Sequence, residues 1–336
     1  MEETMRFIMV SFFTLLATPI FANDSIAEMG AGGLIYVNSA SVEMVSEDLF
    51  ISQDEIRVDY VFKNNSNKDV TSIVAFPMPD ITGSPYEGVS IPFLDNDNLM
   101  GFSVVINGLP LTPKIEQKAY ALGLDVTSIL LSAKVSLLPF GDKTFERLAE
   151  ISVMPDGGKA YIEELEKRGI IENDRYDAGE GVKDHLTPIW TLKSSYWWEM
   201  TFPANQTINV SHRYVPAVGG TVFLSFLNQD GTKGETYDLY VKDYCIDAPF
   251  INAVKRELVN GEGFYETYIS YILKTAQNWS GSIGTFRLSV DKGSTKNFVS
   301  FCGDGVKKNG STTFEFVKKD FYPQNDFKVL ILQRAE

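Results

Sequence analysis

The chain has 336 residues, 44% of them hydrophobic and 12% aromatic, and a formal net charge of −14. This apolar content excludes a disordered polypeptide, and the length is typical of two packed domains. The acidic balance argues against nucleic acid and anionic lipid surfaces as partners, because both are bound through clusters of Lys and Arg.

The first 22 residues have the layout of a secretory signal peptide. Arg6 precedes an apolar core over residues 7–16, and Ala22 stands just ahead of a polar stretch. The core is too short for a membrane span of ~20 residues. We expect cleavage near Ala22, a periplasmic or secreted location, and no membrane span in the mature chain. The cleaved bond and the start codon stay open, because Ile20 is larger than the preferred alanine and Met5 could also begin the chain.

Apolar and polar residues mostly alternate from residue 34 to about residue 113. This period-two pattern is typical of strands with one buried face. Asn107-Gly108 adds a hairpin turn between two such strands. The clearest strand directs one face toward the core with Ile56, Val58, Tyr60 and Phe62.

The pattern becomes helical after residue 115. Apolar residues at helical spacing predict short helices over about 126–133, 143–151 and 158–168. Alternation returns at residue 189. The sequence therefore predicts a helical insertion at about 115–188 within a sheet-forming domain.

The remaining strands and one helix complete a mainly β (α+β) chain. We expect an antiparallel β-sandwich over residues 23–242 that carries the insertion. A second, immunoglobulin-like β domain follows over residues 243–336, with one helix at about 249–259.

Cys245 and Cys302 are the only cysteines. In an oxidising compartment an even pair predicts a disulfide. There is no CxxC motif, and two cysteines with two distant histidines do not have the spacing of a zinc site.

Distinctive short segments are spread over nearly the whole mature chain. They include Gly30-Ala-Gly-Gly-Leu34, Val74-Ala-Phe-Pro-Met-Pro-Asp80, Trp190-Thr-Leu-Lys193, His212-Arg-Tyr214, Tyr271-Ile-Leu273, Asn278-Trp279 and Val299-Ser-Phe-Cys-Gly303. In this combination they resemble the bacterial exported family catalogued as domain of unknown function 4424. The resemblance implies a bacterial origin and an envelope location, and it supplies no catalytic residue.

A second resemblance concerns the fold alone. Phe76-Pro-Met-Pro79, Asn107-Gly108 and Phe202-Pro203 with Tyr214 are similar to features of the VIT domain, a β-sandwich that precedes von Willebrand A domains. No metal-binding DxSxS loop of an A domain follows here, so this likeness says little about function.

The two histidines, His185 and His212, are the candidate general bases. No GxSxG, HExxH or nucleophilic cysteine accompanies them, so we assign no catalytic, cofactor or metal-binding residue.

An acidic, glycine-rich loop offers a candidate surface. Tyr176, Asp177, Glu180, Asp184 and His185 lie close together in sequence and could bind a ligand or perform acid–base chemistry. The spacing of a calcium loop is missing, so a solvated loop is the simpler interpretation.

Two neighbouring tryptophans, Trp197 and Trp198, must face opposite sides of one strand. One belongs to the core, and the other could bind a sugar or a protein partner or be covered by the insertion.

These patterns predict a non-enzymatic envelope protein that binds a protein, a glycan or another envelope ligand. The alternative is a periplasmic hydrolase that uses the carboxylates near His185. No cofactor is expected, and the ligand, the oligomeric state and the biological process are not encoded in any motif.

Overall fold

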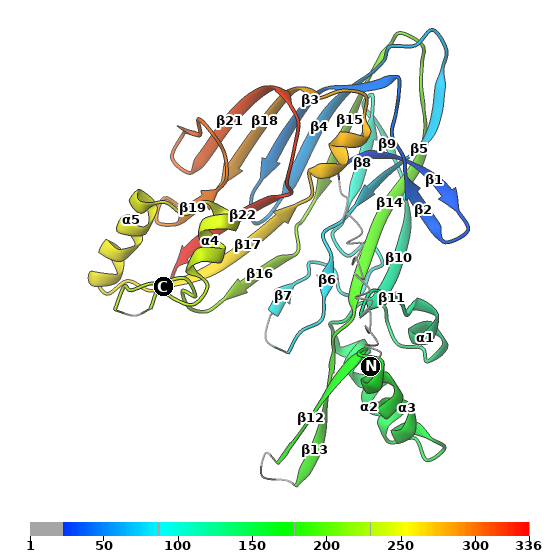
Figure 1. Cartoon of the computed structure of the whole chain (residues 1–336), viewed down its shortest axis with the longest axis vertical. Coiled ribbons are helices and arrows are strands. Elements are labelled where there is room, and N and C mark those ends of the chain that lie inside the picture. Colours follow the sequence, from blue (N-terminus) through cyan, green and yellow to red (C-terminus); the bar gives the residue numbers. More distant parts are fainter. Residues whose placement is uncertain (1–22, 86–87, 178, 180, 229, 336) are drawn as a thin grey trace, which may run out of the picture.

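The computed structural model describes residues 23–335, except residues 86–87, 178, 180 and 229. The expected signal peptide and the candidate Glu180 lie outside the described residues. The prediction of a mainly β protein is confirmed, because strands in three large sheets and one hairpin far outnumber the helices (Figure 1).

The largest sheet has eight strands and spans the upper part of Figure 1. Its neighbours are antiparallel except for one parallel pair, β18 and β3. Its order is β20 (Lys307–Asn309), β21 (Thr313–Phe321), β18 (Ile283–Asp291), β3 (Val42–Ile51), β4 (Ile56–Asn64), β15 (Thr207–Tyr214), β8 (Ser103–Ile106) and β9 (Leu109–Leu111).

A seven-stranded sheet packs against one half of the eight-stranded sheet. Short β6 (Ile81–Thr82) pairs with β14 beside the main path. The main order is β11 (Leu124–Asp125), β10 (Lys114–Ala121), β14 (Thr191–Phe202), β5 (Val70–Pro77), β1 (Ser25–Gly30) and β2 (Gly33–Tyr36).

The core between these two sheets follows the sequence pattern. On β4 the predicted face of Ile56, Val58, Tyr60 and Phe62 is buried. On β14 the buried positions also alternate, and they contribute Tyr196, Trp198, Met200 and Phe202 to the same core. The predicted turn is also present: Asn107 and Gly108 join β8 to β9 with positive φ angles of 48° and 81°, a conformation that favours these two residues.

A five-stranded sheet packs against the other half of the eight-stranded sheet. Two helices, α4 (Tyr237–Tyr244) and α5 (Ala248–Val259), and the 3-10 helix η1 (Lys274–Asn278) accompany it. Its order is β19 (Phe298–Phe301), β22 (Phe327–Arg334), β17 (Phe264–Tyr271), β16 (Val218–Thr221) and β7 (Gly88–Ser90).

Strands from both sides of the expected boundary at residue 242 share the eight-stranded sheet. Thr285–Val290 of β18 pairs with Ser46–Ile51 of β3, and one continuous core contains residues from both segments. The segment after residue 242 therefore adds strands to a sheet of the first sandwich and shares its core. Alternation reveals which face of a strand is buried but not which strand lies beside it, so this pairing left no sequence signal.

The insertion is a separate small unit that projects from the lower end of β10 and β14 (Figure 1). It contains α1 (Thr127–Ser132), α2 (Asp142–Ser152), α3 (Gly158–Lys167) and a hairpin of β12 (Ile171–Asp177) and β13 (Val182–Pro188). The three helices were expected, whereas residues 114–121 are a strand of the main sheet and the hairpin was not foreseen. A core of its own includes Leu130, Leu148, Ile162 and Trp190.

The expected disulfide is confirmed. The sulfur atoms of Cys245 and Cys302 are 2.05 Å apart, and the bond joins the end of α4 to the end of β19. Within the described ranges, no helix combines the length and the apolar character that a bilayer crossing requires.

Candidate functional site

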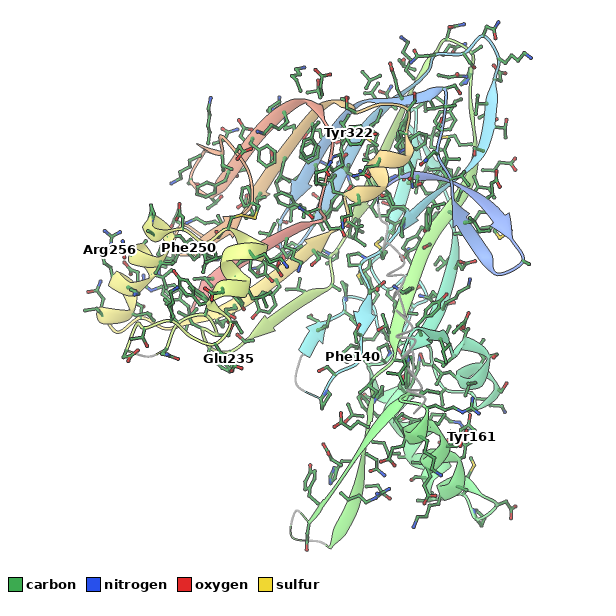
Figure 2. The ribbon with its side chains drawn as sticks, in the orientation of Figure 1. Phe140, Tyr161, Glu235, Phe250, Arg256 and Tyr322 are labelled. Atoms are coloured by element: carbon green, nitrogen blue, oxygen red, sulfur yellow. A yellow bond between two sulfur atoms is a disulfide. The ribbon has the colours of Figure 1, made fainter. Side chains whose placement is uncertain are left out.

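A groove of about 740 Å³ opens where β21 of the eight-stranded sheet and β22 of the five-stranded sheet meet the disulfide. We call it the aromatic groove. Figure 2 labels two of its residues, Phe250 on α5 and Tyr322 after β21. Its aromatic lining consists of Phe250, Phe301, Phe314, Phe316, Phe321, Tyr322 and Phe327.

The floor of the groove is packed before any ligand arrives. Phe301, Phe316 and Phe327 are buried, and the ring of Phe327 lies 5.7 Å from that of Phe301 and 6.4 Å from that of Phe316. Tyr322 at the rim is 50% exposed. Alternation on β21 places Phe314 and Phe316 on one face, which is why two rings of one strand reach the same groove.

Polar and charged residues share the lining with these rings, namely Asp247, Ser300, Asp304, Lys318, Gln324, Asn325 and Asp326. Lys318 pairs with Asp304 at 3.0 Å, and Asp326 accepts hydrogen bonds from the main-chain amides of Leu273 and Lys274. Within the described ranges, no three His, Cys, Asp or Glu residues are close enough to hold a metal ion. The aromatic lining of the groove can hold an apolar or aromatic group beside these polar side chains.

The expected acidic surface lies elsewhere, on the β12–β13 hairpin. The rings of Tyr176 and His185 stack at 3.7 Å and line a hollow of about 430 Å³ together with Phe145 of α2. Asp184 accepts hydrogen bonds from Asn173 at 3.0 Å and Arg175 at 2.9 Å. The bond from Asn173, followed by that from Arg175, lowers the pKa of this exposed carboxyl group.

The register of the β12–β13 hairpin separates His185, the proposed base, from Asp177, one of the proposed carboxylates. His185 stands opposite Asp174, whereas Asp177 stands opposite Val182, about 10 Å further along the strands. Asp177 accepts hydrogen bonds from the amides of Gly179 and Gly181 and so stabilises the turn. Of the described carboxylates proposed for a hydrolase, Asp177 is therefore not a partner of His185, and Asp184 is bonded to Asn173 and Arg175.

The two tryptophans face opposite sides of β14, as expected. Trp198 is buried, and its ring lies 5.3 Å from that of His212. Trp197 is half-buried on the outer face, where the ammonium group of Lys114 lies 4.5 Å from its ring centre. The group over Trp197 is thus a neighbouring side chain of β10 and not the insertion.

Sequence reasoning missed a buried polar cluster in the main core, which we call the N-terminal cluster. Its members are Asn23, Asp24, Glu47, Tyr60, His212 and Tyr271, and none exposes more than 1% of its surface. Asp24 Oδ1 lies 3.0 Å from His212 Nε2, and the hydroxyl groups of Tyr60 and Tyr271 lie 2.9 Å apart. Asn23 Nδ2 donates to Glu47 at 3.0 Å, Tyr271 donates to the same carboxylate at 3.2 Å, and Tyr60 donates to Asn23.

Burial dominates the electrostatics of this cluster. It raises the pKa of Glu47 to about 8, against the lowering effect of the hydrogen bonds from Asn23 and Tyr271. Burial also raises the pKa of Asp24 despite the neighbouring His212. One sequence signal could have found the site: His212 shares the inward face of β15 with Val210 and Tyr214, so alternation places it inside.

The family model described as Domain of unknown function (DUF4424) matches residues 22–330. The chain belongs to this family. Three of the segments that carried the resemblance, around His212, Tyr271 and Asn278-Trp279, meet at the N-terminal cluster of this DUF4424 protein: the Trp279 indole donates to the main-chain oxygen of Asp24 at 2.6 Å, and the Asn278 amide donates to Ser25 at 2.7 Å.

A solved structure similar to this DUF4424 protein is described as a "putative nutrient binding protein" from Legionella pneumophila subsp. pneumophila str. Philadelphia 1. The two share 15% sequence identity with a TM-score of 0.44, and the match covers 93% of this chain and 70% of the other. No curated protein matches the chain significantly.

Proposed function

We propose that this protein is an exported, non-enzymatic binding protein of the bacterial envelope, and that the aromatic groove holds an apolar or aromatic part of its ligand. Export is supported by the signal-peptide pattern over residues 1–22 and by the disulfide, which persists in oxidising compartments. Processing near Ala22 and a periplasmic or secreted location belong to the same proposal.

The observation that carries the binding proposal is the groove itself. Ligand sites are typically concave, ~300–1,000 Å³ in volume, and lined by apolar and aromatic side chains with a few fixed polar groups. A groove of about 740 Å³ with seven aromatic residues in its lining fits the volume and the aromatic part of this description. An envelope peptide with aromatic side chains, or a small aromatic molecule, has the matching chemistry.

A fluorescence titration with the apolar dye 1-anilinonaphthalene-8-sulfonate tests the groove. We expect saturable binding of one dye molecule per chain. Tyr322→Ala and Phe314→Ala should each weaken the affinity about tenfold, because each removes one aromatic wall. The matched control is Tyr265→Ala, which removes an exposed tyrosine of β17 outside the groove.

Equal dye affinity in the groove variants and in the control would contradict the proposal. Thermal melts of all variants establish that they are folded. Intact mass of the protein purified from the periplasm of a bacterial host tests export separately, because processing near Ala22 removes the first 22 residues.

The residues expected from the sequence form a second, smaller contact surface in this proposal. Tyr176 and His185 present a stacked pair on the hairpin of the insertion, beside Asp184; Trp197 is a separate candidate, half-buried on β14. Protein interfaces are enriched in such aromatic groups. Cross-linking of the native protein in the envelope should lose its products with Tyr176→Ala if this surface holds a partner, and unchanged products would exclude that role.

A further inference from the structure

The N-terminal cluster contains more buried acid than base. Asp24 and Glu47 expose 0% and 1% of their surface, and His212 at 0% is the basic side chain that contacts Asp24. In the described part of the chain, no lysine or arginine forms an ion pair with either carboxylate. Buried charges normally require an opposite charge or neutralisation.

Each of the two carboxylates can accept a further hydrogen bond or ion pair. Among the described residues, Glu47 accepts hydrogen bonds only from neutral donors, the Asn23 amide and the Tyr271 hydroxyl group. Asp24 Oδ2 is buried and has no hydrogen-bond partner among the described residues. This unpartnered oxygen and the neutral surroundings of Glu47 indicate that the cluster lacks a cation.

The main-chain nitrogen of Asn23 lies close to the N-terminal cluster. Its side chain bonds to Glu47 through Nδ2, and its Oδ1 accepts from the Asp24 amide at 2.8 Å. Four covalent bonds separate Nδ2 from the main-chain nitrogen of the same residue, so that nitrogen lies within about 5 Å of Nδ2. Asn23 is also the first residue after the expected cleavage point at Ala22.

We infer that signal-peptide cleavage completes the core of this protein: the α-ammonium group of Asn23 becomes the buried cation that pairs with Glu47 and Asp24. Before cleavage the same nitrogen belongs to a neutral amide; among the described residues His212 pairs with Asp24, and Glu47 has no basic partner. The processed chain is therefore more stable than any chain extended at this end. This inference rests on the proposed export, because cleavage after Ala22 creates the amine.

The experiment compares two exported proteins. One is the full chain with its own leader, and the other carries an additional Gly-Ser between Ala22 and Asn23, which moves the amine two residues away. Both are purified from the periplasm with and without Glu47→Gln, and intact mass gives the first residue. The readouts are the urea midpoint and the rate at which an amine-acylating reagent modifies the first residue in the native state.

We expect the amine of Asn23 to react at least about tenfold more slowly than the amine of the extended chain, the factor that corresponds to one pKa unit. The extension should lower the urea midpoint when Glu47 is present and lower it much less in Glu47→Gln. Equal acylation rates would overturn the inference. An extension penalty that is the same with and without Glu47 would also overturn it, because the effect would then be steric.

Two further measurements keep the outcomes distinct. If the extended chain does not accumulate, acylation of the native protein compared with the same protein in urea decides the question, and equal rates in the two states would reject the buried amine. If intact mass shows a different first residue, the export proposal fails at that bond. A chain released at Asn23 from a fusion by a protease then tests the charge pairing by itself.

Discussion

The N-terminal cluster and the aromatic groove are built on the same eight-stranded sheet and have opposite chemistry. β3, β4 and β15 place Glu47, Tyr60 and His212 in the closed core, whereas β21 places Phe314 and Phe316 beside an open groove. Buried polar groups are an informative departure from ordinary burial, whereas Phe316 is buried at the floor of the groove and Tyr322 is exposed at its rim. The closed cluster thus lies within the core, and the open groove is the site that we propose for the ligand.

Loss of the disulfide should have the largest effect, and it should act on the groove. Replacing Cys245 and Cys302 with Ser opens a loop with a sequence separation of 57 residues, which costs about 4 kcal/mol of unfolding free energy in the chain-entropy model. Because both cysteines line the groove, dye binding should weaken as well. Urea unfolding and dye titration measure the two effects, and unchanged dye affinity would separate the disulfide from the groove.

Removal of the buried histidine should come next and should spare the groove. The His212 ring contacts the rings of Phe76, Phe102 and Trp198. His212→Ala removes the partner of the buried Asp24 carboxylate and should lower the free energy of unfolding by about 3 kcal/mol. His185→Ala is the matched control, since it removes only a stacked pair worth at most about 1 kcal/mol. Similar urea midpoints for the two variants would show that the cluster does not support the fold.

The pH dependence of stability should distinguish processed from extended chains. Without the α-ammonium group, burial holds the pKa of Glu47 near 8 in the folded state, above its ordinary value of 4.5. The folded state then binds one more proton, at Glu47, than the unfolded state. The contribution of Glu47 to the free energy of unfolding is therefore complete below about pH 4.5 and is lost as the pH rises toward 8, by ~1.4 kcal/mol per unit of pKa difference.

Asp24, whose pKa burial also raises, lies in the same cluster as Glu47, so the test uses matched pairs of proteins with and without Glu47. In the extended chain, Glu47→Gln should remove the fall between pH 5 and 8. In the processed chain the fall should already be shallow, because the ammonium group lowers the pKa of Glu47. Unfolding midpoints over this range measure both slopes, and identical slopes in all four proteins would exclude a role for Glu47.

The smallest expected effect compares two tyrosine hydroxyl groups. Tyr60→Phe removes a buried donor to Asn23 and should cost about 1–2 kcal/mol, because Asn23 Oδ1 and Tyr271 each lose a partner. Tyr322→Phe removes an exposed hydroxyl group and should change stability by less than about 0.5 kcal/mol. Thermal melts measure both, and a larger loss for Tyr322→Phe would reverse the assignment of the two regions.

Much of the fold was visible in the sequence, and the site was not. Ile56, Val58, Tyr60 and Phe62 showed their common face because alternation is a local property of a strand, and Asn107-Gly108 showed its turn for the same reason. The groove needs rings from β19, β21, β22 and α5 to meet, which depends on how two sheets pack.

The residues proposed from sequence proximity illustrate the limit. Tyr176 and His185 did come together, since a hairpin keeps nearby residues close, but the register moved Asp177 away from His185. Asp24 and His212 are 188 positions apart in sequence and form the buried pair instead. No local pattern relates two such residues.

The amino-acid sequence by itself determined the strand faces, the hairpin turn, the family and the cysteine pair, because each depends on short-range spacing or on residue identity. The tertiary structure decided that β18 lies beside β3, that rings gather in a groove, and that Asn23 and Asp24 enter the core. These features depend on contacts between distant segments, whose free energy is gained only when the sheets pack together.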